Sequence, residues 1–127
     1  MNKISETLLE FAQPIIETLP PNPTLQMRRL ALEIAATVWN AIVIEAWGGE
    51  GKELGPGTLT ELKERLAGLP EPIGTTMGPI IERLAQSKRT RYAGDLRGIG
   101  NWELRTKPNG ELTVWAEARA PSHLKLR

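Results

Sequence analysis

Histidine and cysteine, the side chains most used for nucleophilic, acid–base and metal chemistry, are nearly absent from this sequence. His123 is the only histidine, and it lies beside Pro121 and Ser122 in an expected terminal tail, while cysteine is absent. A Ser-His-Asp triad, a nucleophilic thiol and a metal site built on His or Cys therefore lack their parts. We favour a non-enzymatic role and expect no metal or other cofactor.

Paired carboxylates are the remaining source of acid–base chemistry. Glu33 and Glu45 lie on the same expected helix, but their separation is about 18 Å along an ideal axis and about 120° in azimuth. Neither is a good proton partner for the other. Glu45 belongs to the most apolar part of the helix, so we expect it to be buried. An ion pair with an arginine is the favoured role, ahead of catalysis.

A glycine-rich segment, residues 48–57, contains Gly51-Lys52 and invites comparison with a phosphate-binding loop. Such a loop has four residues between its first glycine and the Gly-Lys pair, Ser or Thr next, and a strand before it. Here Glu53 follows Lys52, and a helix is expected before the segment. We interpret residues 48–57 as a flexible linker.

Basic and aromatic side chains in residues 88–107 predict nucleic-acid binding as an alternative function. They are Lys88, Arg89, Arg91, Tyr92, Arg97, Arg105 and Lys107, with Trp115 as a further ring able to stack on a base. The pI of about 8.1 is below the usual basic footprint. No known DNA- or RNA-binding motif is present, and Glu103, Glu111 and Glu117 interrupt the patch.

The formal net charge of +1 hides two oppositely charged halves. Residues 1–87 carry seven Lys/Arg and eleven acidic residues, a net of −4, whereas residues 88–127 carry nine Lys/Arg and four acidic residues, a net of +5. This asymmetry can steer a partner, favour head-to-tail association, or hold the two halves of one chain together.

The stretch from Asn22 to Gly49 is the longest apolar periodic run, and the other elements must pack around it. Asn22 as the cap and Pro23 in the first turn predict where this helix starts, and the glycines at its end predict where it stops. Trp39 and Ile42 are assigned to the core. The polar stripe of the helix consists of Gln26, Arg29, Glu33, Thr37 and Asn40. Its charges argue against a membrane span.

Ile44 and Trp47 continue this polar stripe with apolar side chains, so either the rest of the chain covers them or they form an exposed patch. Trp115 is expected on the polar face of a hairpin. Ile44, Trp47 and Trp115 therefore form a hypothetical interface of a homodimer, or of a complex with another protein. The open alternative is that the hairpin itself covers Ile44 and Trp47.

Apolar spacing predicts three further helices. The first starts near Ser5 and should kink or break near residues 11–13, because Pro14 removes a backbone hydrogen bond. Another follows the capping box at residues 58–61, and the last runs from about Thr76 to Lys88.

The apolar period changes to two after Tyr92, which predicts strands. Pro108-Asn109-Gly110 is a strong turn that pairs Lys107 with Glu111. The same register gives the pairs Leu104 with Val114 and Trp102 with Ala116 on the core face, and Arg105 with Thr113 and Glu103 with Trp115 on the other face. Residues 92–96 are a candidate third strand.

The predicted fold is α+β, in one domain over residues 1–127. About four helices in residues 4–88 cover a small antiparallel sheet in residues 92–119, followed by a tail. With 127 residues, 24% of them charged, and neither cysteine nor a secretory signal, we expect a cytoplasmic protein without disulfides or membrane contact. The predicted function is a protein-interaction or regulatory module that self-associates.

Overall fold

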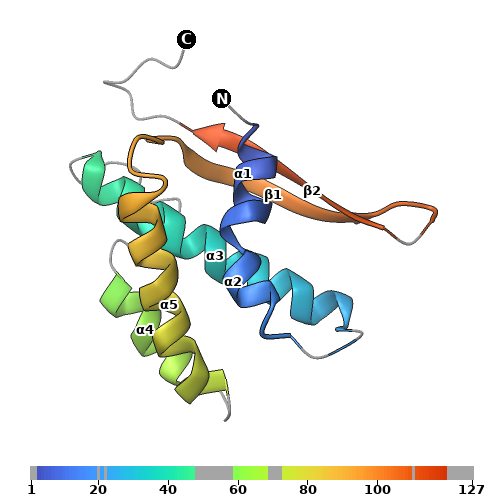
Figure 1. Cartoon of the computed structure of the whole chain (residues 1–127), viewed down its shortest axis with the longest axis horizontal. Coiled ribbons are helices and arrows are strands. Elements are labelled where there is room, and N and C mark those ends of the chain that lie inside the picture. Colours follow the sequence, from blue (N-terminus) through green and yellow to red (C-terminus); the bar gives the residue numbers. More distant parts are fainter. Residues whose placement is uncertain are drawn as a thin grey trace.

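The computed structural model describes residues 3–19, 21, 23–47, 59–68, 73–109 and 111–119. Within these residues, five helices precede a two-stranded antiparallel sheet, which confirms the α+β fold (Figure 1). The helices are α1 (Ile4–Phe11), α2 (Gln13–Ile16), α3 (Leu25–Ala46), α4 (Leu59–Ala67) and α5 (Ile73–Thr90), and the strands are β1 (Gly98–Thr106) and β2 (Leu112–Arg119).

Helix α3 is the centre of the fold, since it contacts each of the other four helices and β1. Helix α1 packs on β2, and α4 lies beside α5. The turn end of the hairpin extends past α1, on the side of the molecule away from α4 and α5 (Figure 1). In the part of the chain that the structure describes, no helix is long and apolar enough to cross a membrane.

The start of α3 differs from the sequence prediction. Thr24, not Asn22, is the N-cap: its backbone is extended, and its Oγ1 accepts a hydrogen bond of 3.1 Å from the N–H of Met27. Pro23 remains outside the helix, so the predicted proline at the first helical position is wrong. Threonine and asparagine are both common N-cap residues, so the sequence pattern did not distinguish Thr24 from Asn22.

The predicted break at Pro14 is confirmed. α1 ends at Phe11, and α2 begins at Gln13, with Ala12 between them. Pro14 occupies the first turn of α2, where its missing N–H costs no helical hydrogen bond. The break lets Phe11, Ala12 and Ile15 all reach the core, where each is at most 2% exposed.

An aromatic cluster forms the middle of the core. Phe11 and Trp39 meet edge to face at 5.1 Å between ring centroids, and Tyr92 contacts both rings at 5.6 and 5.5 Å. Trp39 is fully buried, as predicted, whereas Ile42 is only partly buried and packs against the core from its edge.

The α4–α5 pair confirms the third and fourth predicted helices, although α5 begins at Ile73 and not near Thr76. Gly74 is therefore helical, and Pro79 lies inside the helix. The local cost of these residues is outweighed by burial of Ile81 and its apolar neighbours farther along α5. The capping threonine predicted at position 58 lies outside the described residues.

The predicted hairpin register is confirmed at every pair. β1 and β2 pair antiparallel, with Leu104 opposite Val114, Trp102 opposite Ala116, Arg105 opposite Thr113 and Glu103 opposite Trp115. The N–H of Lys107 donates to the carbonyl of Glu111 at 2.7 Å. The register shifts between Ile99 and Trp102, where β1 holds one extra residue. Gly110, predicted to supply positive φ in the turn, lies outside the described residues.

The predicted third strand at residues 92–96 is wrong. Residues 91–94 form a turn, and residues 95–97 have no regular structure. The reason is that side chains of the helices capture the backbone carbonyls of this connecting segment, so these carbonyls do not pair with a strand. Residues 91–97, between α5 and β1, are called the connecting segment.

Candidate functional site

Ile44 and Trp47 do not form the exposed patch expected from the sequence. They are 2% and 4% exposed, and the indole Nε1 of Trp47 donates a hydrogen bond of 2.8 Å to the carbonyl of Leu96. The connecting segment thus covers this end of α3 within one chain. Trp115 is the one proposed interface residue that remains open to solvent, at 41% exposed.

Helix α3 holds the connecting segment through two tryptophans. The indole Nε1 of Trp39 donates to the carbonyl of Arg97 at 2.6 Å, and that of Trp47 donates to Leu96 at 2.8 Å. Trp39 lies within α3 and Trp47 is its C-cap, eight positions later and about 80° around an ideal helix axis. Each large ring fills the core, and its single N–H fixes one carbonyl of the segment.

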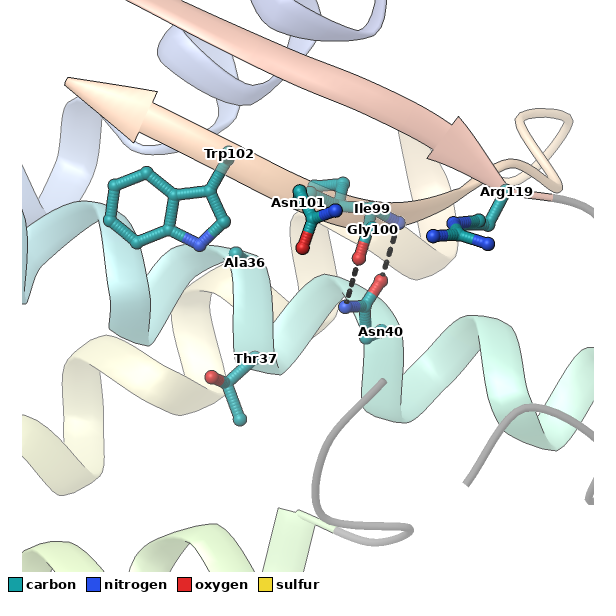
Figure 2. A pocket seen from close by; sticks show the side chains of 8 residues that line it. All are labelled: Ala36, Thr37, Asn40, Ile99, Gly100, Asn101, Trp102 and Arg119. Carbon is teal, nitrogen blue, oxygen red and sulfur yellow. Dashed lines mark hydrogen bonds between the residues drawn. The ribbon is translucent and has the colours of Figure 1, made fainter. Parts of the chain in front are cut away.

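Asn40 lies next to Trp39 and binds the start of β1 (Figure 2). Its Nδ2 donates to the carbonyl of Ile99 at 2.8 Å, and its Oδ1 accepts from the N–H of Ile99 at 2.7 Å. Asn40 is 4% exposed, so its assignment to a solvent-facing stripe is wrong. The Asn40 side-chain amide offers an N–H donor and a C=O acceptor side by side, as a backbone peptide does, so it satisfies both buried backbone groups of Ile99 in place of water.

Lys88 is buried and unavailable to a phosphate. Its Nζ donates to the carbonyls of Tyr92 and Asp95 at 2.7 and 2.6 Å and lies 4.2 Å from the centre of a Trp39 ring. Burial lowers the pKa of Lys88 to about 8, against a partly opposing attraction from Asp95. A lowered lysine pKa is typical of some catalytic amines, but here the ammonium is used to close the connecting segment onto α5.

The remaining five basic residues of the nucleic-acid prediction each have a carboxylate within 4 Å. The pairs are Arg89–Glu45 (3.8 Å), Arg91–Glu10 (2.6 Å), Arg97–Asp95 (2.7 Å), Arg105–Glu103 (2.8 Å) and Lys107–Glu111 (3.7 Å). The structure distributes these cations over α5, the connecting segment and the hairpin, and each one faces a carboxylate.

Ion pairs between the two halves of the sequence support the simplest interpretation of its charge asymmetry. Glu10 of α1 binds both Arg91 and the hydroxyl of Tyr92, the latter at 2.6 Å. Burial, followed by this hydrogen bond, raises the pKa of Tyr92 to about 12. Glu45 is half exposed and pairs with Arg89, so its expected burial is wrong and the favoured ion pair is confirmed. Tyr92 is part of the core cluster and is not free to stack on a base.

The Asp95–Arg97 pair is the most buried ion pair of the group, with side chains 12% and 11% exposed. Burial by itself raises the pKa of Asp95, but hydrogen bonds from the Arg97 side chain and backbone lower it below its ordinary value. The hydrogen bond to Asp95 likewise raises the pKa of Arg97. Both residues therefore stay charged and shape the connecting segment.

A small recess of about 250 Å³ lies between α3 and the start of β1 (Figure 2). Thr37, Asn40, Asn101 and Arg119 contribute polar side chains to it. The Asn40 amide already bonds Ile99, and Arg119 pairs with Glu117 at 2.6 Å. Among the described residues, no group of three or more His, Cys, Asp or Glu side chains is placed to hold a metal ion.

An apolar groove of about 400 Å³ runs under the distal half of the hairpin. Its walls come from α1, α2, the first turns of α3 and the core face of both strands. The lining residues are Leu9, Gln13, Ile16, Leu19, Pro21, Pro23, Arg28, Leu32, Leu104 and Val114. Leu9 is 39% exposed, which leaves apolar surface at the groove unburied. The sequence pattern predicted Leu104 and Val114 on the core face of the hairpin and gave no sign of the groove.

Two side chains cover parts of the strand edges. Asn40 pairs with Ile99 on β1, and on β2 the Oγ of Ser5 accepts from the N–H of Ala116 at 2.9 Å and donates to its carbonyl at 3.4 Å. The backbone N–H and C=O of Ala116 therefore point away from β1, and those of its partner Trp102 point away from β2. Since the direction alternates along an antiparallel strand, the backbone N–H and C=O groups of Leu104 and Thr106 also point away from β2. The hydrogen bond from the N–H of Lys107 to the carbonyl of Glu111, directed between the two strands, agrees with this alternation.

The edge of β1 from Trp102 to Thr106, called here the open edge, has no backbone partner among the described residues. A recess of about 410 Å³ lies against it, lined by Arg29, Trp102, Glu103 and Leu104. On the outer face of the sheet, the Arg105 guanidinium lies 5.7 Å from the ring of Trp115 and pairs with Glu103.

Comparisons of the chain with models of protein families, with curated proteins and with solved structures find no match. The function is therefore argued from the geometry alone.

Proposed function

We propose that this chain is a non-enzymatic protein-interaction module that self-associates through the distal half of its hairpin. The observation that carries the proposal is the open edge of β1. Unpaired N–H and C=O groups along a strand are a template for another strand, and proteins that do not use such an edge usually shorten, cover or charge it. Among the described residues, α3 and α1 cover the strand edges at Ile99 and Ala116, and the charges that β1 carries between them and the turn, Glu103 and Arg105, are of opposite sign.

Three neighbouring features support this proposal. The apolar groove under Leu104 and Val114 provides the kind of surface that a partner buries. Trp115, at 41% exposed, and Arg105 beside it are of the residue types enriched at interfaces. Arg105, Val114 and Trp115 lie on the turn side of Ala116, the β2 residue that Ser5 of α1 contacts.

The alternative function, nucleic-acid binding through residues 88–107, has less support. Lys88 is buried, Tyr92 is in the core cluster, and the other cations are paired with carboxylates. Exposed pairs such as Arg105–Glu103 are weak and can exchange, so Arg105 and Lys107 remain the basic residues to test. Phosphate contacts would show steep salt dependence in binding to mixed single- and double-stranded oligonucleotides.

Sedimentation velocity over a dilution series from about 100 to about 1 μM tests self-association, a range set by the Kd of typical weak-to-moderate complexes. A weight-average sedimentation coefficient that falls on dilution is the expected result. A single species of 14.0 kDa at all concentrations would overturn self-association. A parallel titration of the chain with the oligonucleotides tests the alternative function. Salt-dependent binding by a chain that stays monomeric would favour nucleic-acid binding over self-association.

A further inference from the structure

We propose that two copies of this chain pair β1 with β1 in antiparallel orientation, about a two-fold axis that passes beside Leu104. The result is a continuous four-stranded sheet in the order β2-β1-β1-β2. This inference rests on the self-association proposed above and adds the edge, the orientation and the register. A two-fold axis is the commonest symmetry of homodimers, and it brings the same edge from both copies together.

The backbone of the open edge is self-complementary in this register. Leu104 faces Leu104 of the second copy, and Trp102 faces Thr106 of the second copy. These are the residues whose N–H and C=O groups point away from β2, so each pair can exchange two hydrogen bonds. Their side chains lie on the core face of β1, where Leu104 lines the apolar groove.

The charges on the outer face fit the same register. With Leu104 on the axis, Glu103 of each copy lies opposite Arg105 of the other, as a non-hydrogen-bonded pair with its Cα atoms about 4.5 Å apart. The two opposite-charge pairs each stabilise the association. In the single chain these side chains are 57% and 60% exposed and already pair with each other, so exchanging partners requires no burial of an unpaired charge.

Neighbouring registers are less favourable. An axis at Thr106 would place Arg105 opposite Lys107, a like-charge pair. An axis at Trp102 would require the second strand to reach Ile99, whose N–H and C=O are already bonded to Asn40. On the opposite edge, that of β2, the backbone of Ala116 is already bonded to Ser5. A two-fold axis at Val114 would place Thr113 opposite Trp115, with no pair of opposite charges. Axes at Glu103 or Arg105 would also pair outward backbone groups, but they place Glu103 opposite Glu103 or Arg105 opposite Arg105. Of these registers, the one centred on Leu104 is the one in which all charged pairs across the outer face are of opposite sign.

A recess lies beside the open edge, where the second strand would pair. The recess of about 410 Å³ lies against Trp102, Glu103 and Leu104, with Arg29 of α3 on its far wall. Pairing in the Leu104 register ends where Asn101 meets Lys107 of the second copy, before the position that Asn40 covers. Asn40 therefore limits the new pairing to the open edge and does not block it.

Charge reversal on the outer face tests this register. Glu103→Arg and Arg105→Glu each turn two attractive contacts between copies into two repulsive ones, so each variant alone should dimerise at least about tenfold more weakly than the original chain. Mixing the two variants should restore dimers, because position 103 of each chain then faces a side chain of opposite charge at position 105 of the other. Within each chain the like-charge pair persists in the mixture, so an effect on single-chain folding cannot produce the recovery.

A matched pair of variants controls for general attraction between oppositely charged chains. Glu82→Arg and Arg83→Glu give the same net charges, but both residues are exposed on α5. Each should sediment as the original chain does, with no gain on mixing. If the original chain dimerises and the residue 103 and 105 variants dimerise equally well alone, the register is overturned while self-association stands. A chain that is monomeric throughout would overturn both.

Discussion

The side-chain amide of Asn40 takes the place of a neighbouring strand at Ile99. Nδ2 donates to the Ile99 carbonyl at 2.8 Å, and Oδ1 accepts from the Ile99 N–H at 2.7 Å. Both residues are buried, so neither can exchange these bonds with water. This contact joins the central helix to the first strand across 59 positions of sequence, and it also marks where the open edge of β1 begins.

Replacing Asn40 with Ala should destabilise the fold by about 2–4 kcal/mol, because it leaves two buried backbone groups without a partner. Thr37→Ala is the matched control. Its Oγ1 bonds only the carbonyl of Glu33 within α3, so its loss should cost less than about 1 kcal/mol. Urea unfolding followed by tryptophan fluorescence gives both values. Equal costs for the two variants would show that the Asn40 contact contributes little.

Lys88 should give the fold an unusual dependence on pH. Burial lowers its pKa to about 8, below the ordinary value of 10.5, so above pH 8 the unfolded chain holds this proton more tightly than the folded chain does. Stability from this group therefore rises with pH from about 8 toward 10. Above pH 10 the raised pKa of Tyr92 acts in the opposite direction, because there the folded chain retains the extra proton.

Comparison of unfolding free energies at pH 8 and pH 10 isolates the Lys88 contribution. The rise with pH should be larger in the original chain than in Lys88→Met, and Lys107→Met controls for the removal of one charge at an exposed site. NMR titration of the lysine side chains supplies a direct value. If every lysine titrates near 10.5, Lys88 is not buried as described here.

The two apolar α3 residues predicted as core should differ in their contribution to stability. Trp39 is fully buried and donates to Arg97, so Trp39→Ala should cost about 3–5 kcal/mol. Ile42 is only partly buried, and Ile42→Ala should cost about 1–2 kcal/mol. Thermal or urea unfolding measures the difference. A larger loss at Ile42 than at Trp39 would mean that the apolar face of α3 is misassigned.

The hairpin and the helix break were predictable because local rules determine them. The turn at Pro108 and the alternation of apolar residues led independently to one register, and Pro14 broke the first helix by removing a hydrogen bond. The outward position of Trp115 followed from that register. The register also shows that Glu103 and Arg105 lie on the outer face of the sheet, one residue to each side of Leu104 and with opposite charges.

The hydrogen bonds from helix side chains to Ile99 and to the connecting segment were not predictable in the same way. Asn40 and Lys88 were assigned to solvent or to the end of a helix, because a sequence does not show which distant carbonyl will lie above a polar side chain. The same carbonyls explain why residues 92–96 are not a strand and why Trp47 is covered. Long-range partners of buried polar groups are set by tertiary packing, and helical periodicity carries no information about them.

Amide hydrogen exchange along β1 tests the central claim most directly, since it reports each backbone N–H at the proposed edge. The amides of Leu104 and Thr106 should exchange rapidly in dilute solution and become protected as concentration rises, while the amides of Glu103 and Arg105 stay protected throughout by their pairing with β2. Val114, on the opposite edge, should remain rapid at every concentration. Rapid exchange at Leu104 and Thr106 in a concentrated sample would contradict association through the open edge.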